Sequence, residues 1–379
     1  MLRKGLGKLF NLALLVLSFA LCLVSAEIVI RIVAPQRAEP HPRGFYAPDP
    51  ELGFITVAHG SGVTVSPEFR VRDSTNSLGL RNREVAPKLP GERRVLILGD
   101  SFTYGAGCDM NAAYPQQLEQ ALRSAANSPE ITVINAGIPS YGTRQQAILF
   151  ERIVDRVDPD VVLLGFFLGN DFFDNLNLNK TKVIDGYLVQ ETVEGARVRI
   201  TQLRGIPPEL QIALRTKLHL YTLLMNAWAT VVTKIGLANT EEMFLVYREN
   251  SGPEIENARQ LTYEALHRLS IVCRHRKLPL DLVLIPDGRL AGAVSSKPGY
   301  RFSRPAEIVR GIASTLKLPV LDLTERFEKS DGMYFPIDGH WNVQGHAVAA
   351  REIANALLEG ELRPLLSRSA RASLPYDDH

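Results

Sequence analysis

Residues 95–105 read VLILGDSFTYG and are the stretch that decides the fold. Positions 95–98 carry four consecutive apolar side chains, which is typical of a strand buried on both faces of a parallel sheet. Gly99 ends this run, and Ser101 follows two residues later. In a parallel sheet the carboxyl ends of the strands open onto the crevice where ligands bind. The stretch therefore predicts a buried strand that presents Ser101 at the edge of the sheet.

After this stretch, apolar runs of strand length alternate with segments of helical periodicity. Strands that alternate with helices indicate a parallel sheet covered by helices on both faces. We therefore predict an α/β fold, a three-layer α/β/α sandwich with a mostly parallel sheet, in a domain at residues 93–358. Further strands are predicted at 131–134, 161–164, 280–285 and 320–321, and helices at about 112–124, 143–157, 256–276, 304–316 and 342–358.

Residues 172–255 interrupt this alternation and form a predicted insertion. Apolar runs at 182–184 and 187–189 flank the pair Asp185-Gly186, a turn sequence that favours a β-hairpin. Apolar side chains then recur every three or four residues from 210 to 235, which predicts one long amphipathic helix. Its apolar side would pack on the domain surface, cover the active site as a lid, or contact a membrane surface. Packing on the domain is the favoured interpretation.

The N-terminus has the composition of a membrane segment. Residues 1–8 carry three basic side chains and are predicted to stay in the cytoplasm, and an uncharged apolar run fills 9–26. Because the apolar character continues past Glu27, an uncleaved transmembrane signal anchor at 9–33 is favoured. The alternative is a signal peptide that is cleaved after Ala26. Both predict that the rest of the chain is periplasmic or extracellular, either tethered to the cell membrane or secreted.

Two flanking segments show no regular pattern. Residues 34–92 are rich in proline, glycine and polar residues, and we predict an irregular arm that leads from the membrane to the domain. Residues 359–379 are mostly polar and include Pro364 and Pro375, which predicts a loose C-terminal tail.

Composition narrows the classes of function. The formal net charge is +2 and basic residues are interspersed with acidic ones, so we predict no nucleic-acid partner. The cysteines Cys22, Cys108 and Cys273 form no Cys-x-x-Cys pair and the eight histidines are scattered, so no metal site and no cofactor is predicted. The separation of Cys108 and Cys273 permits a disulfide without demanding one.

Four short blocks of this sequence resemble those of the SGNH, or GDSL-like, hydrolase family, which is named for its Ser, Gly, Asn and His residues. Each block follows a predicted strand or lies near the end of the domain. The residues that carry the resemblance are, in chain order, Ser101, Gly137, Asn170, and Asp338 with His340. The resemblance spans residues 93–358 outside the insertion, and it implies a three-layer fold of esterases and related acyltransferases.

The resemblance also implies a role for each of these residues. Ser101 is the expected nucleophile and His340 the base that takes its proton, because a hydroxyl is a weak nucleophile without a base. Asp338 is expected to hold the imidazole in one tautomer. The expected oxyanion donors are the backbone N–H groups of Ser101 and Gly137 and the side-chain amide of Asn170.

The blocks depart from the family pattern at three places. Leu168 stands where the family usually has a glycine, two residues before Asn170. Phe102 stands where GDSL proteins carry leucine, and we expect it to pack inward. One residue separates Asp338 from His340 where most members have two, and Trp341 follows. This spacing resembles the alginate O-acetyltransferase branch of the family. It leaves two alternatives open, a Ser–His–Asp triad or a Ser–His dyad.

Four further polar residues are expected to have structural roles. Asp100 and Asp171 are predicted to bond nearby loops, and His346, at the start of the last helix, is predicted to pack or to cap. Cys108 has no base near it in the sequence and is predicted to be a small buried residue.

Three functions are compatible with these patterns. The favoured one is a membrane-tethered, extracytoplasmic serine esterase that removes or transfers small acyl groups, acetyl above all, on a carbohydrate through an acyl-serine intermediate. The carbohydrate part follows from family analogy and expected export. The second is a lipase or thioesterase with the helix at 210–235 as its lid. The third is a non-catalytic carbohydrate-binding or assembly protein on the same fold, which the presence of all four blocks disfavours.

Overall fold

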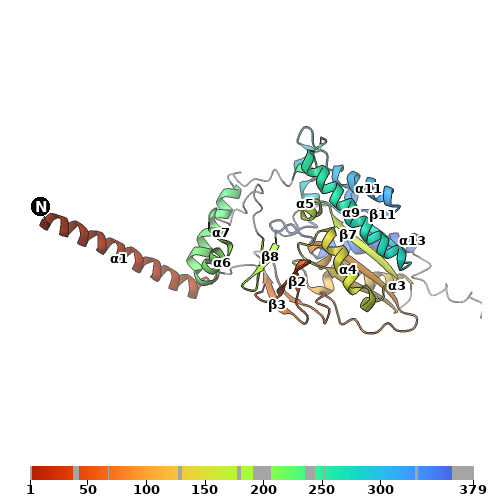
Figure 1. Cartoon of the computed structure of the whole chain (residues 1–379), viewed down its shortest axis with the longest axis horizontal. Coiled ribbons are helices and arrows are strands. Elements are labelled where there is room, and N and C mark those ends of the chain that lie inside the picture. Colours follow the sequence, from red (N-terminus) through yellow and green to blue (C-terminus); the bar gives the residue numbers. More distant parts are fainter. Residues whose placement is uncertain are drawn as a thin grey trace, which may run out of the picture. The chain divides into compact units, whose positions relative to one another are not determined.

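The computed structural model of the chain describes residues 2–36, 42–66, 68–126, 130–176, 181–190, 206–234, 244–250, 252–328 and 332–360. The chain divides into two compact units (Figure 1). One consists of Met1–Pro40 with Glu191–Asn239, and the other of His41–Gln190 with Thr240–His379.

The larger unit is built on a five-stranded sheet in which every neighbouring pair is parallel. The strand order is β11-β10-β7-β5-β6. These strands are β5 (Arg93–Gly99), β6 (Ile131–Gly137), β7 (Val161–Phe167), β10 (Leu280–Ile285) and β11 (Val320–Asp322), as the sequence predicts to within two residues at most ends. The chain moves from β5 to β6 on one side and then returns to β7 on the other, so β5 is the point where the strand order reverses. Such a switch point is where α/β sheets bind ligands.

Alternate side chains of the central strands face two separate helical layers. Leu96 and Leu98 of β5 pack in one core with helices α4 (Thr143–Val157), α9 (Pro253–His275) and α11 (Arg304–Leu316). Val95 and Ile97 pack in a second core with α3 (Tyr114–Ala126) and α13 (Val343–Glu359). All four side chains are fully buried, which explains the continuous apolar run. The predicted three-layer α/β/α sandwich is confirmed.

The prediction of an irregular arm at 34–92 is wrong where its described part forms β-hairpins. The segment forms two antiparallel hairpins, β1 (Tyr46–Asp49) with β2 (Gly53–Thr56) and β3 (Ser61–Val65) with β4 (Arg70–Ser74). These hairpins form because several apolar side chains of the segment are buried, although its overall composition is polar.

Phe45, Tyr46 and Phe54 are buried in the main core, and the ring of Phe54 lies 5.2 Å from that of Tyr141. The arm therefore belongs to the larger unit from residue 42 onward. Only the stretch from 34 to 36 lies in the smaller one, and residues 37–41 and 67 are outside the described ranges.

The insertion begins with α5 (Asp171–Leu176) and the predicted hairpin, β8 (Thr181–Ile184) with β9 (Tyr187–Gln190). Its turn residues Asp185 and Gly186 both have positive φ, 49° and 77°, which is the geometry that Asp-Gly favours. The hairpin prediction is confirmed.

The predicted single helix at 210–235 is two helices, α6 (Pro208–Lys217) and α7 (His219–Lys234). Leu218 between them is extended, with φ −121° and ψ 103°. The carboxylate of Glu27 accepts hydrogen bonds from the backbone N–H groups of His219 and Leu220, which starts a new helix at that point. Ile235, the last residue of the predicted stripe, lies outside the described ranges.

The N-terminal helix α1 (Leu2–Val33) contains a span, Phe10–Val33, that is long and apolar enough to cross a membrane. Its mean hydropathy is 2.6 and none of it is buried. At the other end of the chain, α13 ends at Glu359, and the predicted tail lies outside the described ranges from residue 361 onward.

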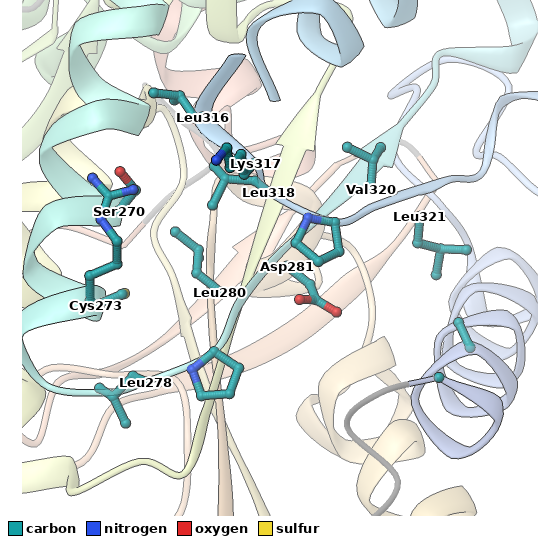
Figure 2. Close-up of a pocket in the computed structure, with 15 residues that line it drawn as sticks. Ser270, Cys273, Leu278, Leu280, Asp281, Leu316, Lys317, Leu318, Val320 and Leu321 are labelled. Atoms are coloured by element: carbon teal, nitrogen blue, oxygen red, sulfur yellow. The ribbon is translucent and has the colours of Figure 1, made fainter. Parts of the chain in front are cut away.

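A groove of about 790 Å³ opens where β10 and β11 begin (Figure 2). Its walls come from the starts of these two strands and the carboxyl ends of α9 and α13, with Leu280, Val320 and Cys273 among the lining residues. Because the strands are parallel, this is the edge of the sheet opposite to Ser101. Cys108 and Cys273 are both buried and both free thiols, so no disulfide joins them.

Candidate active site

Ser101 is held at the carboxyl end of β5 by the local structure that follows the strand. It is the first residue of the one-turn helix α2 (Ser101–Tyr104), which begins because the Asp100 side chain accepts the Phe102 N–H at 2.9 Å. Gly105 ends the turn in a left-handed conformation, φ 84°. Asp100 thus has the local bonding role that the sequence predicts. This arrangement leaves the Ser101 side chain partly accessible at the sheet edge.

His340 lies against Ser101 although 239 positions separate them in the chain. Its Nε2 is 2.7 Å from Ser101 Oγ, and its Nδ1 is 2.5 Å from Asp338 Oδ1. With a proton on Nδ1, donated to the carboxylate, Nε2 is free to accept the serine proton. The structure thus brings together the hydroxyl, the imidazole and the carboxylate, and the one-residue spacing does allow Asp338 to reach His340.

The carboxylate of Asp338 stays ionised in this position. Partial burial opposes its charge, but the hydrogen bond from His340 and the positive charge of Arg289 outweigh burial and hold the pKa of Asp338 below its ordinary value. An ionised carboxylate fixes the imidazole tautomer and stabilises the imidazolium ion.

Gly339 makes the tight Asp-x-His spacing possible. Its backbone has φ +96°, a conformation that residues with a side chain rarely adopt. An ideal Cβ at this position would lie 2.1 Å from Nη1 of Arg289, so a residue with a side chain would have to displace the guanidinium group. Arg289 is fixed in turn by two hydrogen bonds to the buried carboxylate of Asp287, at 2.9 and 2.7 Å.

Glu68, in the connection between β3 and β4, holds the same loop from the other side. Its Oε2 accepts the backbone N–H groups of Ile337 and Asp338, at 2.9 and 2.6 Å. The neighbouring Phe69 packs its ring 5.1 Å from that of Phe335. Sequence reasoning missed Glu68 and Arg289, because neither lies in a recognisable motif and the first lies in the segment predicted to be irregular.

A cluster of aromatic side chains packs against the imidazole of His340. The ring of Phe102 lies 4.1 Å from Phe167, 5.1 Å from His340 and 5.2 Å from Trp341. Phe102 and Trp341 are both buried, so the inward packing predicted for Phe102 is confirmed. The cluster restricts the rotation of His340 and keeps its Nε2 directed at Ser101.

The structure shows a packing role for Gly137 beside the role predicted for it. This residue ends β6, in register with Gly99 of β5, and its N–H already donates to Oδ1 of Asn135 at 2.9 Å. The N–H therefore already has a partner in the structure, and its role as an oxyanion donor stays a prediction. Glycine is needed here for packing, because a Cβ would lie 2.3 Å from the backbone nitrogen of Tyr104.

Asn170 lies in the turn that follows β7, the other neighbour of β5. Its Oδ1 is buried and has no hydrogen-bond partner within the described part of the chain. The next residue, Asp171, accepts the Phe167 N–H at 3.1 Å and so bonds a nearby strand end, as predicted.

His346 and Cys108 are unsuited to proton transfer or nucleophilic attack. Burial lowers the pKa of His346 to about 3, and its Nδ1 accepts the N–H of Tyr114 at 3.3 Å, so it is a neutral packing residue. Burial raises the pKa of the Cys108 thiol to about 11, which keeps it protonated at neutral pH. Both residues have the structural roles that the sequence predicts.

Comparison with known proteins gives a consistent result for the family. The model of the GDSL-like Lipase/Acylhydrolase family matches residues 97–348, about two thirds of the chain. No curated protein matches the sequence.

Several solved structures are similar to this chain at low sequence identity. A putative lipolytic protein of the G-D-S-L family from Desulfitobacterium hafniense is 12% identical, covers 70% of this chain and 100% of its own, and has a TM-score of 0.39. The acetyl xylan esterase AlAXEase is 13% identical over 70% of this chain and 99% of its own, with a TM-score of 0.41. The SGNH-hydrolase family esterase AlinE4 is 17% identical over 72% and 97%, with a TM-score of 0.36.

The family match begins within the strand before Ser101 and includes all of the blocks named above and the loop that carries Asp338 and His340. The chain belongs to the GDSL-like lipase/acylhydrolase family, whose members have the SGNH hydrolase fold.

Proposed function

We propose that this protein is a membrane-tethered, extracytoplasmic serine esterase that removes or transfers small acyl groups, acetyl above all, on a carbohydrate. The observation that carries the proposal is the hydrogen-bonded series Ser101 Oγ, His340 Nε2, His340 Nδ1 and Asp338 Oδ1, with separations of 2.7 and 2.5 Å. A nucleophile, a base and an orienting carboxylate in this order support acyl transfer through a covalent intermediate.

The reaction proceeds in two halves. Ser101 Oγ attacks the ester carbonyl while its proton passes to His340 Nε2, and the tetrahedral intermediate collapses as the imidazolium returns that proton to the departing alcohol. The acyl group is then an ester of Ser101. Water, or a sugar hydroxyl, gives its proton to His340 and attacks this ester, which releases a free acid or an acylated sugar and restores the serine.

The oxyanion of each tetrahedral intermediate requires donors that are already in place. We assign the Ser101 backbone N–H and the Asn170 side-chain amide to this role, because both follow strands that end at the same edge of the sheet. A single donor of this kind typically contributes about 10²–10³ in rate. Gly137 contributes by allowing α2 to approach β6 closely.

The proposed location is supported by α1. Its span of 24 residues is preceded by basic residues, which favours a signal anchor with the N-terminus in the cytoplasm and the larger unit outside. The carbohydrate part of the proposal is supported by expected export and by the resemblance of the Asp-Gly-His-Trp block, Asp338 to Trp341, to O-acetyltransferases.

The test uses the full chain in detergent with an acetyl ester and an octanoyl ester of the same chromophore, each with and without an acetyl-accepting oligosaccharide. We expect turnover of the acetyl ester, and Ser101→Ala should abolish it. Ser295→Ala, which changes an exposed serine at the end of α10 (Ala291–Ser295), is the matched control and should keep full activity.

The other outcomes are equally informative. Faster turnover of the octanoyl ester would indicate a lipase or thioesterase. Acetylated oligosaccharide among the products would indicate transfer rather than hydrolysis. Equal activity of wild type and Ser101→Ala on every ester would refute the assignment of the nucleophile, and absence of Ser101 labelling by an organophosphonate would favour a non-catalytic protein.

A further inference from the structure

We propose that α7 is a membrane-contacting helix whose apolar face lies against lipid beside α1. This face would contact lipid at the boundary between the hydrocarbon core and the headgroups of the bilayer. The inference rests on the proposed membrane tether, because it requires α1 to be inserted.

Contacts with α1 fix where α7 begins along the length of the apolar span. The carboxylate of Glu27 accepts the N–H groups of His219 and Leu220 at 3.0 and 2.8 Å. Six residues separate Glu27 from Val33, the end of the span, which is about 9 Å along a helix. The first turn of α7 therefore starts at membrane depth rather than beyond the end of the anchor.

Two further contacts fasten the same junction. Arg31 donates to the carbonyl of Lys217 at 2.6 Å and also pairs with Glu27 at 2.8 Å. The backbone N–H of Gln36 donates to Nδ1 of His219 at 2.8 Å. Glu27 thus binds the start of α7 to α1, Arg31 binds the end of α6, and His219 binds the residues that follow α1, so α6 and α7 lie at the carboxyl end of α1 (Figure 1).

The two sides of α7 differ in what they contact. Thr222 and Met225 are buried on one side. On the other, Leu224, Trp228 and Val231 are 58%, 54% and 47% exposed, at spacings of four and three residues that align them on one stripe. A contiguous apolar stripe of this kind marks an interaction surface rather than a water-facing one.

Lipid fits this stripe better than any other occupant. The 16 residues of α7 contain no charged side chain before Lys234, yet they are too few to cross a bilayer core, which needs about 20. A short apolar helix with a tryptophan at its exposed face is typical of helices that lie in the interface. Arg31 of α1 and Lys217, the last residue of α6, lie next to the start of α7 and suit the phosphate groups of the lipid headgroups.

Trp228 is a built-in probe for this proposal. The sequence contains two tryptophans, and the other, Trp341, is fully buried in the larger unit.

The full chain is reconstituted into phosphatidylcholine vesicles in which the lipids carry bromine either near the headgroup or near the chain ends. Tryptophan emission is compared between wild type and Trp228→Phe, and the difference reports position 228 alone. Aqueous acrylamide is the opposing quencher, and carbonate extraction of the same vesicles reports the insertion of α1.

We expect shallow bromine to remove most of the Trp228 emission, deep bromine to remove less, and acrylamide to have little effect. If acrylamide quenches Trp228 and bromine does not, the lipid contact is overturned. Resistance of the chain to carbonate extraction in the same vesicles would show that α1 is still inserted. Protection from both quenchers would mean that protein covers the stripe, which also overturns the lipid contact. Release of the chain by carbonate would overturn the tether itself, together with the inference that rests on it.

Discussion

The guanidinium group of Arg289 lies against the backbone of Gly339, so closely that a Cβ at position 339 would fall 2.1 Å from Nη1. This contact joins the loop after β10 to the loop that carries Asp338 and His340. The imidazole is therefore positioned by the packing of two loops at one edge of the sheet, in addition to its hydrogen bonds.

The first prediction concerns Gly339→Ala. The added methyl group must displace Arg289 or the loop, and the positive φ adds strain, so we expect kcat/KM for an acetyl ester to fall by about 10², the usual cost of misplacing a catalytic group by roughly 1 Å. The matched control is Gly299→Ala, which also has a positive φ, +77°, but has open space around it. Similar activity of the two variants would show that the contact with Arg289 has no part in positioning the loop.

The second prediction separates a triad from a dyad. In Asp338→Asn the amide cannot stabilise the imidazolium and favours the wrong tautomer, so we expect kcat to fall by about 10³–10⁴. Asp109→Asn, at an exposed aspartate with no side-chain capping bond, is the control and should leave kcat unchanged. If Asp338→Asn keeps activity close to that of wild type, then Ser101 and His340 act as a dyad.

The third prediction concerns Glu68, which bonds the backbone of Ile337 and Asp338. Glu68→Ala removes a charged acceptor from two N–H groups, and hydrogen bonds of this kind contribute about 1.5–3 kcal/mol, so kcat should fall roughly 10-fold or more. KM should change little, because Glu68 is expected to act on the loop and not on substrate. Glu68→Gln keeps one acceptor oxygen and should recover part of the rate. A normal kcat in Glu68→Ala would exclude this positioning role.

The fourth prediction is a pH dependence of stability that originates at His346. Its pKa in the folded protein, about 3, lies below the ordinary value of 6.5, so the unfolded chain takes up a proton as the pH falls through 6.5 while the folded chain does not. Stability that is present above pH 6.5 is therefore lost on acidification, by up to about 1.4 kcal/mol per pH unit.

Chemical unfolding of the full chain in detergent, at about pH 7.5 and about pH 5, measures this loss. His346→Gln keeps an acceptor for the Tyr114 N–H but does not titrate, so its free energy of unfolding should change less between the two values. His275→Gln, at an exposed histidine, should behave like wild type. Parallel pH dependence in wild type and His346→Gln would assign the acid sensitivity to other groups.

Several features were predictable from the sequence because they depend on local chemistry. The apolar run at 95–98 can be satisfied only by burial on both faces, and the alternation of such runs with amphipathic helices specifies a parallel sheet with two helical layers. In such a sheet the residues that follow successive strands gather at one edge, which is why Ser101 and Asn170 could be placed there from their order alone.

Other features depend on contacts between distant segments, and these the sequence did not reveal. Glu68 and Arg289 lie in unremarkable loops and become important only because the chain brings them to either side of Gly339. The break at Leu218 has no helix-breaking residue to announce it, since it depends on a carboxylate supplied by Glu27, 191 positions earlier than Leu218.

The sequence by itself determined the layers of the fold and the strand that precedes Ser101, because burial is a property of short segments. The resemblance of its four blocks to a known family indicated which residues meet at the site. Only the tertiary structure decided that a one-residue spacing lets Asp338 reach His340, that the Gly137 N–H already has a partner, and that residues from 42 onward pack as part of the domain. Each of these depends on which atoms lie within a few ångströms across long sequence separations, and composition and periodicity do not encode that proximity.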